Sequence, residues 1–225
     1  MSGIAWLVAI ALAIAAIWLW RRARMAARAE YIRSFDFPPG IFDKLAQRHP
    51  QLQQKDRQLV AQGLRQFFLA YLQSGCQFVS MPSQVADDLW HEFILYTRNY
   101  AQFCRKAFGR FLHHTPAVVL SRNHRDNTGL RRVWWQCCKQ EHLDPRNALR
   151  LPLLFALDTK LGIEGGFVYA VDCRALRSRD PGGGPTHCGG DMDSDAFDGT
   201  TDGFGDGAGG DGGDGGGCGG GCGGD

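Results

Sequence analysis

Side chains that bind metals or transfer protons recur in the middle of this chain. Asp87 and His91 are four residues apart, so on one helix both side chains lie on the same face. Cys104 follows them, and His113 and His114 stand together in an expected turn. Carboxylate oxygen, imidazole nitrogen and thiolate sulfur are all ligands for zinc and similar metals. These five residues are therefore a candidate zinc site.

A single unbroken helix would not bring all of these ligands together. The apolar periodicity predicts one long helix, capped by Ser83 and running to about Gly109. On such a helix Cys104 points about 140° away from His91, so both join one site only if the helix kinks near Asn99 or another segment wraps over it. The alternative is a hydrogen-bonded Asp and His pair in a structural bundle. The expected core-facing residues are Leu89, Phe93, Tyr96, Tyr100 and Phe103.

The elements around this helix are also predicted to be helical. Residues 41–48, 56–74 and 130–142 carry apolar side chains at helical spacing, and Pro or Gly lies close to the ends of these stretches. Residues 151–157 are continuously apolar, which is typical of either a helix or a buried strand. The sequence predicts a mainly α protein with an α-helical bundle over residues 30–179.

The chain begins with an uncharged apolar run from Ile4 to Trp20, followed by Arg21, Arg22 and Arg24. A helix of roughly 20 residues crosses a bilayer, and arginine and tryptophan favour its edges. A cleaved secretory signal is the alternative, but positive charge precedes the apolar run in such signals, whereas here it follows. We expect residues 1–29 to be a single-pass transmembrane anchor, with the N-terminus outside and the remaining chain in the cytoplasm.

The last part of the chain differs sharply in composition. Ten aspartates and no lysine or arginine occur from Asp180 onward, so with a net charge of +2 for the whole chain, residues 1–179 carry +12. The same tail is rich in glycine and poor in apolar residues, and we expect residues 180–225 to be disordered. An acidic tail of this kind could associate with the basic body or recruit a basic protein partner.

The tail also carries thiols. In a cytoplasmic chain the eight cysteines are expected to be reduced or bound to metal rather than paired. His187, Cys188, Cys218 and Cys222 form a second candidate site for a soft metal such as zinc or copper. The alternative is a flexible acidic tail with free thiols.

One short motif resembles a known family. Asp87, Trp90 and His91, followed by Tyr100 and the pair at residues 113–114, are similar to the glycine-rich-domain-containing-protein-like family. Its members show an aspartate, a Trp-His pair, a tyrosine and a later histidine. The resemblance covers residues 37–114, and the apolar block at residues 151–158 resembles a bacterial branch of the group. It implies no established reaction.

Taken together, these features predict a membrane-anchored interaction or scaffolding module. The alternative is a metal-dependent enzyme or metal-binding protein that uses the Asp, His and Cys cluster, with zinc as the expected ion. Nucleic acid is an unlikely partner, because the arginines near the anchor suit anionic lipid headgroups and Trp134 and Trp135 suit a helix core. Walker-type phosphate loops, Gly-x-Ser-x-Gly elbows and His-Glu-x-x-His pairs do not occur in the sequence.

Overall fold

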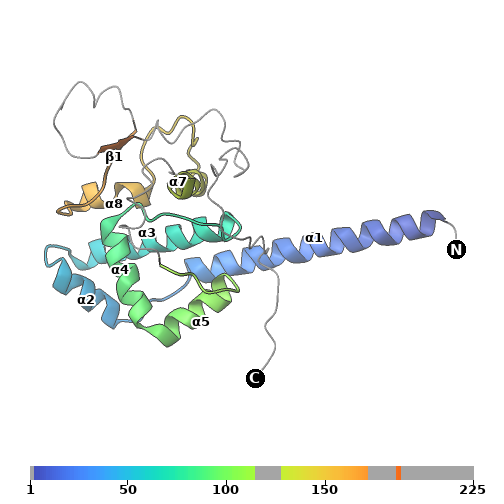
Figure 1. The fold of residues 1–225 in the computed structure, drawn as a ribbon, viewed down its shortest axis with the longest axis horizontal. Coiled ribbons are helices and arrows are strands. Elements are labelled where there is room, and N and C mark those ends of the chain that lie inside the picture. The colour runs from blue at the N-terminus through green and yellow to red at the C-terminus, as the bar shows by residue number, and fades with distance from the viewer. Residues whose placement is uncertain (1–2, 115–127, 172–185, 189–225) are drawn as a thin grey trace, which may run out of the picture.

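The computed structural model describes residues 3–114, 128–171 and 186–188, and in these residues the protein is mainly helical (Figure 1). This confirms the predicted fold class. The described helices are α1 Gly3–Arg33, α2 Gly40–Arg48, α3 Gln54–Gln73, α4 Gln84–Leu95, α5 Thr97–Ala107, α7 Thr128–Gln140 and α8 Leu153–Leu161. Two short strands, β1 Val168–Ala170 and β2 Thr186–Cys188, pair in parallel with Val168 opposite Thr186.

The N-terminal helix α1 leaves the rest of the molecule as a long projecting rod (Figure 1). Among the described residues, it is the one helix long and apolar enough to cross a membrane. Arg22 and Arg24 lie over the rings of Trp18 and Trp20, at 5.3 and 5.2 Å from the ring centroids. Only the last turns of α1 join the core, where Ile32 is fully buried. The boundary expected between residues 29 and 30 therefore falls inside one continuous helix.

Helix α3 lies at the centre of the folded part. It contacts α1, α4, α7 and α8, and its residues from Gln66 to Leu72 are buried without interruption. A helix with one solvent face would expose every third or fourth residue, so this run requires neighbours on all sides. The Phe68 ring lies 4.9 Å from Phe103 and 6.0 Å from Trp90 between ring centroids. The aromatic core is therefore built around α3.

The single helix predicted from Ser83 to about Gly109 is wrong. The chain leaves the helical conformation at Tyr96, with φ −79° and ψ 61°, and α5 starts again at Thr97. Phe93 and Tyr100, on either side of the break, are both buried. They are seven residues apart, so the apolar pattern stays in phase across the break and gave no sign of it. The undecided apolar block at residues 151–157 lies mainly in helix α8, which ends at Gly162 in a left-handed conformation.

A buried carboxylate on α8 holds the start of α4. Asp158 is only 3% exposed and accepts hydrogen bonds from the Ser83 hydroxyl at 2.8 Å and from the Gln84 and Val85 amides at 2.7 and 3.2 Å. The Phe167 amide donates to the same carboxylate at 2.9 Å. The first amides of a helix have no hydrogen-bond acceptor within the helix. The negative charge of the carboxylate also interacts favourably with the positive end of the helix dipole. Asp158 therefore provides hydrogen-bond acceptors for the amides of the first turn of α4 and joins α4 to α8.

The start of α8 is held in the same way by residues of α3 and of the end of α7. The Leu153 amide donates to the Glu141 carboxylate, and the Leu154 amide donates to the Gln66 side-chain oxygen at 2.9 Å. Gln66 in turn donates to Glu141 at 2.8 Å. Side chains from other elements thus take the place of a local cap for α8.

We expect Asp158→Asn to lower the free energy of unfolding by about 1–3 kcal/mol, because the amide group keeps one acceptor oxygen and turns a donor toward buried donors. The measurement is urea unfolding of the full-length protein in mild detergent, followed by circular dichroism. Asp56→Asn is the matched control, since the exposed Asp56 accepts one amide hydrogen bond, from Gln53 at 3.0 Å. Equal losses in the two variants would contradict this role for Asp158.

Candidate metal centre

Two of the candidate ligands lie on the first turns of α4. Asp87 and His91 share one face of the helix, as their spacing predicts, and His91 Nδ1 is 3.5 Å from an Asp87 carboxylate oxygen. The Asp87 side chain is 17% exposed and the His91 side chain is 45% exposed. The pair therefore lies at the edge of the helical core, where a small molecule can reach it.

His114 is brought to this pair by the segment that follows α5. The Tyr100 hydroxyl donates to the Leu112 carbonyl at 2.6 Å and accepts from the Trp90 indole at 3.2 Å. The Trp90 ring also packs edge-on against the His114 ring, with centroids 4.6 Å apart. These buried contacts fix the segment against α4, so that a histidine distant in sequence lies beside Asp87.

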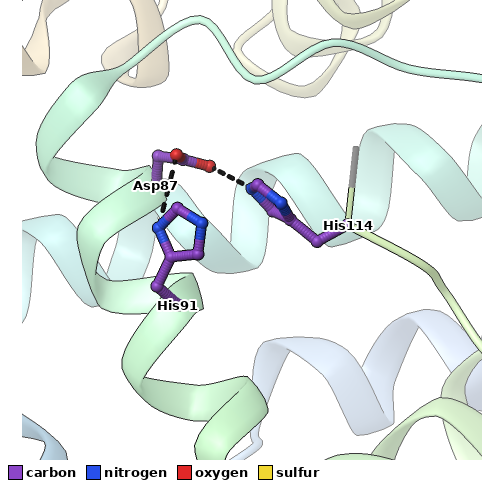
Figure 2. A group of neighbouring side chains, drawn as sticks. All are labelled: Asp87, His91 and His114. Carbon is purple, nitrogen blue, oxygen red and sulfur yellow. Dashed lines mark hydrogen bonds and ion pairs between the residues drawn. The ribbon is translucent and has the colours of Figure 1, made fainter. Parts of the chain in front are cut away.

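The three side chains converge on one point (Figure 2). His114 Nε2 lies 2.9 Å from Asp87 Oδ1, and the His91 and His114 ring centroids are 4.2 Å apart. One ligand atom from each of Asp87, His91 and His114 lies within 4.8 Å of the others. Ligands around a tetrahedral zinc ion are roughly 3.3 Å apart, given bonds of about 2.0 Å. The donor types fit a zinc-class ion, and the separations of the Asp87 oxygens from His114 Nε2 and His91 Nδ1, 2.9 and 3.5 Å, lie close to this value.

Cys104 and His113 are not part of this group. Cys104 is fully buried beside Tyr100, and burial raises the pKa of its thiol. His113 is exposed, and its ring lies 4.8 Å from that of Phe111. The chain does break and a second segment does wrap over α4, but that segment brings His114 rather than Cys104 to Asp87. A buried protonated thiol is a packing group rather than an available ligand.

Sequence reasoning missed the neighbouring carboxylate, Asp88. It binds Arg48 at 2.6 Å and His49 Nε2 at 2.8 Å, at the end of α2. Adjacent residues on a helix point about 100° apart, so Asp87 and Asp88 meet different partners. Asp88 joins α2 to α4 and is already engaged. The only signal in the sequence was the pair Arg48 and His49 at the end of the helix predicted over residues 41–48. No sequence pattern linked this pair to Asp88.

The second candidate site, in the tail, stays a prediction. The backbone of His187 and Cys188 belongs to β2, whereas Cys218 and Cys222 lie outside the described residues. The predicted disorder covers residues 180–225. The structure describes three of these residues, Thr186–Cys188, and places them in strand β2 rather than in a disordered segment, whereas residues 180–185 and 189–225 lie outside the described residues. Among the described residues, Cys104, Cys137 and Cys138 are buried free thiols, and Cys76 is also buried.

A pocket of about 240 Å³ adjoins two of the three ligands. Asp87 and His114 line it, together with Trp90 and a rim that includes Arg110 and Phe111. Its volume is below the range of typical drug-sized sites, so it suits a small group or one end of a larger molecule.

We expect the Cys104 thiol to resist iodoacetamide at pH 8 in the folded protein, because burial both shields the sulfur and raises its pKa. Peptide mapping by mass spectrometry measures the labelled fraction, and the same protein in guanidinium serves as the control, where Cys104 should be labelled fully. Fast labelling of Cys104 in the native state would show that the thiol is accessible after all.

Comparison with known proteins gives a family without a described activity. No curated protein and no solved structure matches the chain significantly. The resemblance to the glycine-rich-domain-containing-protein-like family is wrong, because residues 27–192, which include the whole motif, match the model of the UCP032817-like family instead. The motif is a few residues around Trp90 and His91, and so short a pattern does not separate one helical family from another. The longer match covers most of the chain, which therefore belongs to the UCP032817-like family.

Proposed function

We propose that this protein is a membrane-anchored metal-binding protein, and that Asp87, His91 and His114 hold one divalent ion of the zinc class. The observation that carries the proposal is the convergence of the three ligand atoms within 4.8 Å, at the edge of a pocket. Of the functions expected from the sequence, the one with an Asp and His metal site is thus the better supported.

The surroundings of the three ligands favour a binding site over an ordinary surface cluster. The His114 side chain is only 12% exposed, and the Trp90 ring packs edge-on against the His114 ring. Such support from neighbouring groups orients metal ligands before the ion arrives. Three protein ligands leave a coordination position free, as in catalytic rather than structural zinc sites. When bound, an ion of this kind supplies Lewis-acid chemistry at that position.

The other expected function, in which the helical domain is an interaction or scaffolding module, stays a prediction. The protein partner expected for the acidic tail depends on residues 180–225, of which the structure describes only residues 186–188. Metal binding and recruitment of a partner by the tail are compatible, since they use different parts of the chain.

We expect the full-length protein to bind one zinc ion per chain in a background in which Cys188, Cys218 and Cys222 are replaced by serine. In that background, His114→Ala should weaken zinc binding by at least about a hundredfold, because a direct ligand is lost. Metal content after dialysis against a zinc buffer, measured by mass spectrometry, gives the result.

His113→Ala is the matched control, because this neighbouring histidine is exposed and lies outside the cluster. It should keep its zinc. The proposal fails if the serine background binds no zinc, or if His114→Ala binds zinc as well as His113→Ala does.

We further propose that α1 spans the membrane with the N-terminus outside and the helical domain in the cytoplasm. The length and composition of the helix support a membrane span. The orientation rests on Arg21, Arg22 and Arg24, which follow the apolar run directly and favour the cytoplasmic side.

A Ser2→Cys variant tests this orientation. In intact cells that express the protein, a membrane-impermeant maleimide should label Ser2→Cys and leave the wild type unlabelled, because all eight native cysteines follow the anchor. Mass-tagged maleimide and an immunoblot measure the labelling. The reverse pattern, with the wild type labelled, would place the folded domain outside.

A further inference from the structure

The pocket beside the metal ligands has the position and the chemistry of a lipid-binding site. We propose that it takes an anionic amphiphile from the membrane surface, a lipid with a phosphomonoester headgroup. This inference rests on the proposed function, because Asp87 and His114 line the same pocket. It adds the class of substrate or ligand that the metal centre would meet.

Contact with α1 sets the distance of the pocket rim from the proposed membrane. Arg28 of α1 packs against Gly109, because a side-chain carbon added at Gly109 would overlap the Arg28 guanidinium. Gly109 has a φ of +75°, and Arg110 and Phe111 follow it directly. Arg28 is eight residues beyond Trp20, so it lies about 12 Å along the helix axis from the end of the apolar run. The Arg110 and Phe111 rim is therefore at about this height.

That height is within reach of a lipid. The headgroup layer on each side of a bilayer is roughly 6 Å thick, given a hydrocarbon core of about 30 Å within a total of 40–45 Å. A lipid bound at the rim therefore has to move beyond the membrane surface by only about the thickness of one headgroup layer. Tilting of α1 would shorten the distance between the rim and the membrane. The chains of such a lipid stay partly in the bilayer.

Part of the pocket lining is apolar and accessible. Phe78 and Phe111 both line the pocket and are 48% and 44% exposed. A single exposed phenylalanine needs no explanation, but two that line one pocket offer a contact for acyl chains. Val79 and Met81 continue this apolar wall. A free polar metabolite would gain nothing from these side chains.

The lining of the pocket also carries positive charge. Arg110 is exposed on the rim, and Arg105 and Lys106 lie in the last turn of α5, just before it. Arginine binds phosphate oxygens in a bidentate manner, so Arg110 is suited to hold a phosphomonoester at the mouth of the pocket. A phosphate oxygen is also a donor that a zinc-class ion accepts, on the side where Asp87 and His114 lie. Arg110 and the candidate metal ligands of the pocket therefore favour the same anion, while its exposed phenylalanines favour an apolar chain.

The test is a titration of the full-length protein in neutral detergent with dihexanoyl phosphatidic acid, followed by calorimetry. We expect saturable binding that is at least about tenfold tighter than that of dihexanoyl phosphatidylcholine or of inorganic phosphate. Equal binding of phosphatidylcholine would overturn the role of charge. Equal binding of inorganic phosphate would show a site for a free anion and overturn the membrane source.

Two variants locate the site, each with a matched control. Arg110→Gln and Phe111→Ser should each weaken phosphatidic acid binding by about tenfold. Arg98→Gln and Leu95→Ser should not, because these exposed residues of α5 and α4 do not line the pocket. Unchanged affinity in Arg110→Gln would overturn the proposal, and this substitution of an exposed side chain leaves the core intact if Phe111→Ser fails to fold.

Zinc content measured on the same samples separates this inference from the proposed function. Arg110→Gln should keep its zinc, because Arg110 is not one of the ligands. Loss of selective phosphatidic acid binding with zinc retained would be the expected signature of the site. A wild-type protein that binds zinc but shows no preference for phosphatidic acid would overturn the lipid proposal alone, whereas a protein without zinc would overturn the metal centre.

Discussion

The buried carboxylate of Asp158 fixes where α4 begins, and α4 carries two of the three candidate metal ligands. Its oxygens accept the Gln84 and Val85 amides and the Ser83 hydroxyl, all at the first turn of the helix. Asp158 is held by α8, whose own first turn is capped by Glu141 and Gln66. The position of Asp87 thus depends on two successive helix caps. In each cap, side chains from another part of the chain accept the hydrogen bonds of the first helix amides.

The two adjacent aspartates of α4 have the same side chain but different partners, and therefore different roles. Asp88 meets Arg48 and His49 and joins two helices. Asp87 meets His91 and His114 beside a pocket. Both are carboxylates paired with a histidine, so residue type alone does not distinguish them. What differs is that Asp88 has a guanidinium as a further partner, whereas Asp87 has a second imidazole and an adjoining pocket, which suits a cation bound from outside.

Helix α1, the proposed anchor, is rigidly connected to the candidate site. Helix α1 continues without a break from its apolar run into the core, where Ile32 is buried and Arg28 packs against Gly109. A flexible linker would let the domain move relative to α1, whereas a continuous helix holds the domain at a fixed distance from the apolar run. In the proposed arrangement, with α1 across a membrane, the pocket rim next to Gly109 would keep its distance from the bilayer, and the proposed lipid ligand would have a physical route to the candidate metal ligands.

The sequence by itself determined the helical class, the apolar N-terminal helix and the same-face pair of Asp87 and His91, because each depends on periodicity, composition or local spacing. The sequence did not predict the break at Tyr96, because the apolar pattern remains in phase on both sides of it. Only the tertiary structure selected His114 over Cys104 and His113 as the third member of the cluster. That choice depends on the buried hydrogen bonds of Tyr100 with Trp90 and the Leu112 carbonyl, which are contacts between distant segments and leave no local pattern in the sequence.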